Sequence, residues 1–356
     1  MPAPAADRFE GLLLGLMAGD CLGLPLEGLS PRRARRLFAG PLRHRFFLGR
    51  GMMSDDTEHA SLTGQALLAS RGDPDAFASA LAWGLRWWFL GLPAGIGLAT
   101  LRSILKLWLG FSPSSSGVLS AGNGAAMRSP ILGLVFWDDP DRLRGFCGRS
   151  TRLTHTDPRA ERGARAAAEA ARYACTSDPA TFSRAEILAR IAAVFPPEDA
   201  EARRWLGTLR SALDESWDAD RFASAMGFTH GVSGYIYATL PAALWAWLSD
   251  PFDFRGGMER ILRLGGDADT TGAVYGALAG AAVGVQGIPR EWLDGIADFP
   301  RSPAWVRELG LRLHQAFVAK RDVRPLRLQW PLLAVRNPLF MVVVLAHGLR
   351  RLLPPY

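Results

Sequence analysis

The sequence predicts a protein that is mostly or wholly α-helical, and three observations support this prediction. Apolar residues recur at intervals of three and four along most of the chain, no run alternates polar and apolar residues for long enough to make a strand, and the breaks between the periodic runs are short. The 356 residues, 49% of them hydrophobic, suffice to bury a large core. We therefore expect a compact bundle of many helices.

The helical period is clearest in six stretches, which are residues 77–92, 161–176, 185–195, 203–217, 239–248 and 257–264. Breaks rich in Gly, Pro, Ser or Asp fall at residues 29–33, 70–75, 110–117, 195–199, 249–257 and 285–292. None of these breaks resembles an interdomain linker, so we expect one domain over residues 1–320. Residues 321–356 are rich in Arg, Pro and Leu, and we expect them to form an extension that docks on this domain as a helix.

Composition narrows the class of protein. The net charge is +7, but only Lys106 and Lys320 are lysines among the 41 basic residues, and the arginines are scattered along the chain. This pattern argues against a nucleic-acid partner, which would require a clustered basic surface. The odd number of cysteines without metal spacing favours a reducing, cytoplasmic compartment; they are Cys21, Cys147 and Cys175.

Neither end of the sequence predicts a membrane span. Asp7 and Glu10 precede the first apolar stretch, where a signal peptide would have a basic region. The C-terminal apolar run Pro338–Leu349 has about a dozen residues, below the roughly 20 that a spanning helix needs. We expect this run to dock on the protein, with peripheral contact to a membrane surface as the alternative.

One acidic cluster stands at the entrance of a glycine-rich helix. In "GGDADTTGAVYGALAGAAVG", residues 265–284, Asp267 and Asp269 would point to nearly opposite sides of a helix, so they converge only from a loop or a first turn. Gly265 and Gly266 give the backbone freedom for a loop, and the helix is expected to start near Thr270. Glycines then recur at every fourth position, a stripe that lets another helix approach closely: Gly272, Gly276, Gly280 and Gly284.

A second acidic cluster, "MSDDTEHA" at residues 53–60, offers similar groups. Taken alone, either cluster is interpreted as helix capping, since Asp and Thr are good N-caps and Asp55 with Glu58 makes a capping box. Taken together, each offers two carboxylates and a hydroxyl, in a chain without a cysteine or histidine pair at metal spacing. Such oxygen ligands suit Mg²⁺, and two metal ions would keep four crowded carboxylates ionised.

Five motifs give the sequence a specific resemblance. In chain order they are "GLMAGDCLGLPLEG", "SDDTEHA", "SAGNGAAMRSPILG", "LTHTDPRA" and "GGDADTTGAVYGALAGA", which together span Gly15 to Ala281. On these motifs the chain resembles the ADP-ribosylglycohydrolase family of all-helical enzymes with a dinuclear metal site. The resemblance implies a compact orthogonal multi-helix bundle and two Mg²⁺ ions, with Mn²⁺ as the alternative. It also implies hydrolysis at the anomeric carbon of the distal ribose in an ADP-ribosyl conjugate, which releases ADP-ribose.

The resemblance implies the residues of the metal site as well. The metal ligands would be Ser54, Asp55, Asp56, Asp267, Asp269 and Thr270. Ser54 stands where the family usually has Thr, and its hydroxyl keeps the ability to coordinate a metal. Glu27, Asp56 and Asp269 would form the catalytic set. Glu27, expected on a loop after the first helix, would be the general acid/base or would orient water, with Asp20 supporting the site by hydrogen bonding.

The same resemblance places the diphosphate of ADP-ribose along a glycine-rich turn, where backbone N–H groups bind phosphate oxygens. The residues of this turn are Ser120, Ala121, Gly122 and Asn123. His155 would lie near the ligand, and Gly234 and Tyr235 would contact it on the adenosine side. An ordinary turn, a structural histidine and a core tyrosine are the alternative interpretations of these residues.

One departure from the family affects the expected substrate. Many relatives carry an acidic residue where this chain has Gly95, and in arginine-specific members that carboxylate faces the guanidinium leaving group. Arginine-linked, serine-linked and O-acetyl conjugates all stay open, as does a cognate ADP-ribosyltransferase system. The alternative functions are a catalytically silent ADP-ribose sensor, a Mg²⁺-dependent hydrolase of another nucleoside or phosphate substrate, and a membrane-tethered regulator.

Overall fold

The protein is all-helical. Its structure is a computed structural model that describes residues 2–354, in which there are isolated β-bridges but no sheet. The α-helices are α1 (Ala6–Gly23), α2 (Pro31–Leu37), α3 (Asp55–Ser70), α4 (Pro74–Leu90), α5 (Leu98–Trp108), α6 (Pro130–Val135), α7 (Pro140–Arg152), α8 (Pro158–Ala174), α9 (Arg184–Ala192), α10 (Ala200–Asp214), α11 (Ala219–Met226), α12 (Ile236–Ser249), α13 (Phe254–Arg263), α14 (Ala268–Val283), α15 (Arg290–Asp294), α16 (Pro303–Phe317) and α17 (Trp330–Arg350). Three short 3₁₀-helices are η1 (Leu24–Leu26), η2 (Asn123–Ala125) and η3 (Val285–Gly287). The predicted fold class is therefore confirmed.

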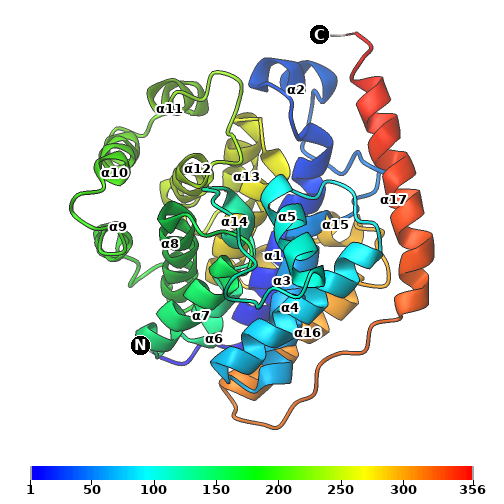
Figure 1. Cartoon of the computed structure of the whole chain (residues 1–356). Coiled ribbons are helices and arrows are strands. Elements are labelled where there is room, and N and C mark those ends of the chain that lie inside the picture. The colour runs from blue at the N-terminus through cyan, green and yellow to red at the C-terminus, as the bar shows by residue number, and fades with distance from the viewer. Residues whose placement is uncertain (1, 355–356) are drawn as a thin grey trace.

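Helices α1 and α14 form the centre of the fold, and nearly all of their residues are buried (Figure 1). Facing glycines let the two backbones touch, since a Cβ atom at Gly276 would lie 2.1 Å from the carbonyl oxygen of Gly15. A Cβ atom at Gly19 would lie 2.0 Å from the carbonyl oxygen of Gly272. The glycine stripe predicted for the helix that follows the acidic cluster is confirmed, and it brings α14 directly against α1.

Alanine at Gly276 is expected to destabilise the protein by about 1–3 kcal/mol or more, because its Cβ meets backbone that cannot rotate away. The control is Gly207→Ala in α10, where the added Cβ would have no described atom within 4 Å. There alanine is expected to stabilise the helix by about 0.5–1 kcal/mol. Urea unfolding of both variants measures the difference, and equal effects would contradict the close approach of α1 and α14.

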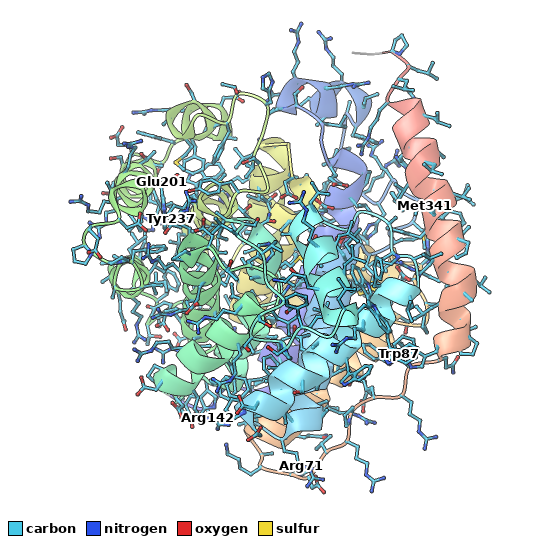
Figure 2. All side chains as sticks on the ribbon, viewed as in Figure 1. Arg71, Trp87, Arg142, Glu201, Tyr237 and Met341 are labelled. Carbon is cyan, nitrogen blue, oxygen red and sulfur yellow. The ribbon has the colours of Figure 1, made fainter. Side chains whose placement is uncertain are left out.

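The other helices surround this central pair. α16 packs along α1, whereas α8, α12 and α13 pack against α14, and α3 lies against both α4 and α16. Figure 1 shows α9, α10 and α11 as an outer row at one edge of the molecule and α17 at the opposite edge. Figure 2 places Tyr237 of α12 beside the start of α10, where its hydroxyl donates to Asp199 at 2.6 Å.

The six predicted helical stretches coincide with α4, α8, α9, α10, α12 and α13, within a few residues at each end. These helices are amphipathic or apolar, and their buried residues follow the predicted spacing. The breaks predicted between them fall at or next to helix ends, where Asp or Ser often caps the next helix, as Asp73 caps α4 and Asp199 caps α10.

The C-terminal extension holds a longer helix than the sequence predicts. α17 covers 21 residues with Pro338 inside it, because the residues before this proline continue the same helix. The expectation that the apolar run is too short to span a membrane is therefore wrong as to length. By length and a mean hydropathy of 1.7, α17 could cross a membrane, and so could the segment Ala6–Leu26, which is 94% buried inside the protein. Length and composition alone are weak evidence for a span.

Polar contacts hold α17 against the body of the protein. Arg336 is buried and donates to Asp298 at 2.9 Å and to the carbonyl oxygen of Met53, while Asn337 donates to the carbonyl oxygen of Gly91. A small apolar cluster adds to these contacts and consists of Leu24, Phe46, Met52, Ala94, Phe340 and Val343. α17 consequently lies beside the segment that leads into α3.

Candidate active site

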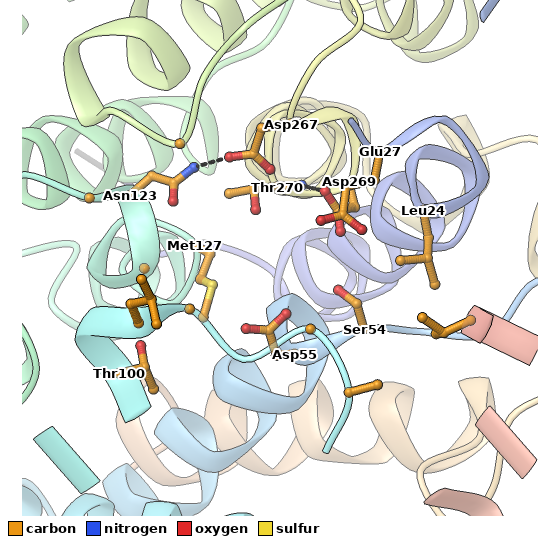
Figure 3. A pocket seen from close by; sticks show the side chains of 18 of the residues that line it. Leu24, Glu27, Ser54, Asp55, Thr100, Asn123, Met127, Asp267, Asp269 and Thr270 are labelled. Carbon is orange, nitrogen blue, oxygen red and sulfur yellow. Dashed lines mark hydrogen bonds between the residues drawn. The ribbon is translucent and has the colours of Figure 1, made fainter. Parts of the chain in front are cut away.

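Several segments that are distant in sequence meet around a cavity of about 500 Å³ (Figure 3). They are the N-termini of α3 and α14, the end of η1, the turn at residues 120–124, the loop before α5 and the last turns of α17. In Figure 3 Asn123 lies on one side of the cavity and Leu24 with Glu27 on the other, and Asp267, Thr270, Asp269 and Asp55 lie between them. The two acidic clusters predicted from the sequence thus face one cavity.

The start of α14 brings Asp267 and Asp269 together. The helix begins at Ala268, two residues before the predicted start, so that Asp267 is the residue before the helix and Asp269 lies in its first turn. Asp267 makes no capping hydrogen bond; instead, its carboxylate accepts from Nδ2 of Asn123 at 2.7 Å. Capping therefore does not explain this aspartate.

The start of α3 is capped, but by a different residue from the one predicted. Oγ of Ser54 accepts from the backbone N–H of Asp56 at 3.3 Å. The expected capping box of Asp55 and Glu58 is wrong, because the buried Glu58 carboxylate accepts from Nε1 of Trp88 at 2.6 Å and from Arg301 at 2.9 Å. Asp55 therefore remains on the cavity wall.

Asp56 joins the two helix N-termini. Its Oδ2 accepts from Oγ of Ser54 and from Oγ1 of Thr270, each at 3.2 Å. Its other oxygen, Oδ1, is buried and has no hydrogen-bond partner among residues 2–354. A buried carboxylate oxygen without a donor is costly, so this atom marks a place where a bound group would stabilise the protein.

Asp20 holds the first turn of α3 through hydrogen bonds. Its carboxylate accepts from the backbone N–H groups of Ser54 and Thr57, at 2.9 and 3.1 Å, and from the Thr57 hydroxyl. The side chain is fully buried, and burial raises its pKa to about 6. Asp20 thus fixes the first turn of α3, the supporting position that the sequence predicts for it.

The carboxylates of the site repel one another. Burial, followed by the charges of neighbouring carboxylates, raises the pKa of Asp55, Asp56 and Asp269 well above the ordinary value. Burial and the Asp267 carboxylate also raise the pKa of Glu27, while the guanidinium of Arg351 lowers it. Glu27 directly follows η1, on the loop where the sequence predicts it. Such crowding is typical of carboxylates that share a cation.

No group of three or more His, Cys, Asp or Glu side chains stands close enough to hold a metal ion within the part of the chain that the structure describes. The four expected aspartate ligands therefore do not form such a group by themselves, and the hydroxyls of Ser54 and Thr270 belong to the expected set as well. Among the six expected ligands, Asp56 lies beneath the cavity wall and the others line it. The donor chemistry, with oxygen atoms only, fits a hard divalent cation.

The turn at residues 120–124 forms the opposite wall. Ser120, Gly122, Asn123 and Gly234 line the cavity, as the sequence predicts for a ligand site. Ala121 does not line it; its carbonyl oxygen instead accepts from the N–H of Ile236 at 3.0 Å and ties the turn to α12. The position of Ala121 therefore does not support the predicted contact with a ligand.

His155 and Tyr235 differ in their placement. His155 lines the cavity and packs against the glycines of the turn, and burial with the nearby Arg128 guanidinium lowers its pKa to about 3. It is thus a neutral ring. Tyr235 lies beside the cavity, where its hydroxyl donates to Glu201 at 2.8 Å, so it is not a wall residue.

Several wall residues are not among the site residues that the sequence predicts. They are Leu24, Phe46, Ala94, Thr100, Met127, Phe340, Val344, His347, Gly348 and Arg351. Five of them belong to α17 or directly follow it, in the extension that the sequence suggests is merely appended. The sequence of an apolar helix that ends in arginines looks the same whether the helix only docks on the protein or also lines the site.

The fold and the cavity define a helical protein with an acidic site between two helix N-termini, and comparisons with known proteins agree with the fold. A sequence model of the ADP-ribosylglycohydrolase family matches residues 1–322. The chain belongs to the ADP-ribosylglycohydrolase family, whose members are hydrolases of glycosidic bonds.

Individual relatives cover most of the chain. The ADP-ribosyl-[dinitrogen reductase] glycohydrolase of Rhodospirillum rubrum is 27% identical over 299 residues, which is 81% of this chain and 90% of that protein. The ADP-ribosylarginine hydrolase Tri1 of Pseudomonas putida is 28% identical over 318 residues, 83% of this chain and 76% of that protein. A solved structure described as an ADP-ribosylglycohydrolase-related protein complex is 30% identical, with a TM-score of 0.62 over 87% of this chain and 98% of its own.

Proposed function

We propose that this protein hydrolyses the bond at the anomeric carbon of the distal ribose in an ADP-ribosyl conjugate and releases free ADP-ribose. The observation that carries the proposal is the meeting of two acidic helix N-termini on one cavity, with the glycine-rich turn across from them. Family membership supports the same reaction class. The name of one relative above gives a protein target and that of the other gives the ADP-ribosylarginine linkage, and the linkage that this chain cleaves is decided by the experiment below.

We further propose that two Mg²⁺ ions, or Mn²⁺ in their place, belong to the site. Ser54, Asp55, Asp56, Asp267, Asp269 and Thr270 would hold them. The unpartnered Oδ1 of Asp56 and the raised pKa values of the neighbouring aspartates support this fit. When bound, the ions would supply Lewis-acid chemistry at the ribose hydroxyls and at a water molecule.

The chain's own residues have separate tasks in this proposal. The turn at Ser120–Asn123 contacts the diphosphate and holds the substrate in one orientation. The N–H groups of Gly122 and Asn123 are not among its donors, because they donate to Oγ of Ser120 at 3.2 Å and to the carbonyl oxygen of Gly234 at 3.0 Å. Glu27 lies beside the reacting ribose and takes or gives the proton at the water or the leaving atom, a role that its raised pKa favours. Asp20 keeps the first turn of α3 in place. The buried free thiols are consistent with the cytoplasmic location that we propose.

The test is release of free ADP-ribose from arginine-linked, serine-linked and O-acetyl conjugates, with Mg²⁺ and with EDTA. Release from at least one conjugate that EDTA abolishes is the expected result. ADP-ribose binding measured by calorimetry runs in parallel. Binding without release from any conjugate would favour a silent sensor, and absence of binding would contradict the proposed substrate class.

Glutamine in place of Glu27 is expected to lower kcat by about 10²–10⁴-fold, the usual contribution of a general acid or base. The Glu27 side chain lines the cavity, and its backbone N–H rather than its carboxylate ends η1, so the variant should fold normally. The dissociation constant of ADP-ribose should change little. A variant with full kcat would show that another group moves the proton.

Metal removal is expected to affect stability in a pH-dependent way. Folding raises the pKa values of Asp55, Asp56 and Asp269, so in EDTA the folded protein binds more protons than the unfolded chain. The folded protein therefore loses stability as the pH rises through these raised pKa values. Mg²⁺ would replace the protons. The difference in Tm between Mg²⁺ and EDTA should therefore widen as the pH rises above the ordinary carboxylate range and through the raised pKa values of these aspartates.

This difference is the quantity to measure by scanning calorimetry, since contributions from buried histidines and cysteines are present in both samples and cancel. Asp269→Asn is the matched variant, because it removes one titrating ligand without changing the side-chain volume. The widening should shrink in this variant. A difference that is constant with pH in the wild type would contradict metal binding by these carboxylates.

A further inference from the structure

The end of α17 places a single cationic side chain in the cavity. Of the described residues that line the cavity, Arg351 is the only arginine or lysine. Its guanidinium donates to the carbonyl oxygen of Pro25 at 3.3 Å, and its charge acts on both Glu27 and Asp269. Its backbone is also held, because Arg33 donates to its carbonyl oxygen. Arg351 is therefore fixed beside the group proposed to move the proton.

Arg351 lies at one end of the cavity, away from the glycine-rich turn. The glycine-rich turn with Asn123 lies at one side, the acidic cluster lies in the middle, and Leu24, Glu27 and α17 lie at the other side (Figure 3). This inference rests on the proposed function: if the diphosphate lies on the turn and the distal ribose at the acidic cluster, the leaving group must point toward α17. We call this part the leaving-group compartment, bounded by Leu24, Phe46, Ala94, Gly95, Phe340, Val344, His347 and Arg351.

The walls of the leaving-group compartment are apolar apart from Arg351 and the neighbouring Glu27. Leu24, Phe46, Ala94 and Phe340 belong to one buried apolar cluster. The His347 ring already has a partner in Phe46. It stacks on the Phe46 ring with a centroid distance of 4.9 Å, and its Nε2 lies 2.8 Å from the carbonyl oxygen of Phe46. Gly95 contributes no side chain, and a Cβ there would have no described atom within 4 Å. No acidic side chain other than Glu27 and the aspartates at the ribose faces this space from the residues described.

We propose that Arg351 makes the enzyme prefer leaving groups that are neutral or anionic with an apolar body, and reject cationic ones such as a guanidinium. A guanidinium in an apolar compartment beside Arg351 would meet a like charge at low dielectric, whereas a carboxylate would meet an opposite one. The family match ends at residue 322, before α17 begins, so this selectivity is a property of the added helix.

The chemistry balances for such a leaving group. The oxygen of water forms a bond to the anomeric carbon while the bond from that carbon to the leaving oxygen breaks. The leaving oxygen keeps the bonding electron pair, and water loses one proton to Glu27. A leaving carboxylate departs as the anion, whereas a leaving phenoxide takes up the proton that Glu27 received from water. No oxidant or reductant is needed.

The test uses three conjugates of ADP-ribose in which the anomeric carbon carries a phenoxy group with a carboxylate, a carboxamide or an amidinium at the para position. They have nearly the same shape and differ in charge. The wild type is compared with Arg351→Gln and with the control Arg350→Gln, which removes the same charge from the neighbouring exposed arginine that bonds Pro354. Comparing each variant with the wild type cancels the intrinsic reactivity of the three phenols.

In Arg351→Gln, kcat/KM for the carboxylate conjugate should fall relative to the amidinium conjugate by about tenfold, which corresponds to the loss of one close charge interaction. Arg350→Gln should leave this ratio unchanged. Equal loss for all three conjugates, or no loss, would overturn the inference and make Arg351 a packing residue or a partner of Glu27 alone.

Binding of the three conjugates by calorimetry separates this inference from the proposed function. If the protein hydrolyses none of them and none of the arginine-linked, serine-linked and O-acetyl conjugates, the proposed function fails. The order of the three dissociation constants in the wild type and in Arg351→Gln still decides whether Arg351 selects by charge. If the three conjugates have the same order of dissociation constants in Arg351→Gln as in the wild type, the inference is overturned by binding as well. Thermal unfolding confirms that both variants are folded.

Discussion

Alanine in place of Asp269 is expected to abolish metal-dependent release of ADP-ribose, with a fall in kcat/KM of more than about 100-fold, the upper value for loss of a residue that only supports a metal ligand. Asp269 lies in the first turn of α14, its Oδ1 accepts from the N–H of Thr270 at 3.0 Å, and it faces the cavity together with Asp267 and Asp55. Its loss would remove a proposed ligand and loosen the hold on Thr270.

The same substitution is expected to stabilise the protein in EDTA, because it removes a carboxylate whose pKa is raised by burial and, next, by the charges of neighbouring carboxylates. Loss of activity with equal or higher Tm in EDTA is therefore the signature of a functional residue. Release assays with and without Mg²⁺, together with calorimetry in EDTA, measure both effects. Loss of activity caused by unfolding would contradict this assignment.

Methionine in place of Arg336 is expected to destabilise the protein by about 3–5 kcal/mol, the usual cost of leaving a buried charge without its partner. Arg336 and Asp298 are both buried, and two guanidinium nitrogens of Arg336 lie near the Asp298 carboxylate, at 2.9 and 3.1 Å. Loss of the arginine would also free the carbonyl oxygen of Met53, one residue before Ser54. We expect lower activity as well, since α17 would loosen beside the site.

A second substitution shows whether the unpaired charge is the cause. In the double variant Arg336→Met with Asp298→Asn, the buried charge disappears, while the asparagine oxygen can still accept from the N–H of Met53, which Asp298 now binds at 2.9 Å. The double variant should therefore be more stable than Arg336→Met alone. Urea unfolding measures both, and an equally unstable double variant would show that packing of the arginine stem, rather than charge, holds α17.

Much of the fold follows from local sequence signals. The helices with a clear apolar period were predicted to within a few residues, because burial on one face dictates that period. The glycine stripe of α14 was also predicted, since only the absence of side chains at a repeated position allows backbones to touch. The sequence predicts a start for α14 that is two residues too late, because Ala268 and Asp269 look like loop residues next to Gly266.

The acidic part of the site could be predicted because it is built from two short segments, each with several oxygen atoms. The leaving-group side could not. Arg351 is one of many arginines in an Arg-rich chain, and its approach to Glu27 depends on how α17 docks through Arg336. The burial of Arg336 against Asp298 is a tertiary contact with no local pattern in either segment.

The pairing of α1 with α14 has a consequence for the way the chain folds. These two helices come from opposite parts of the sequence, and neither can bury its apolar surface until the other is present. The entropy of closing so long a loop must be lost before their contacts form, which slows folding and leaves apolar helices exposed meanwhile. Refolding is therefore expected to be limited by the encounter of the two helices, and the acidic cavity would form in that same step.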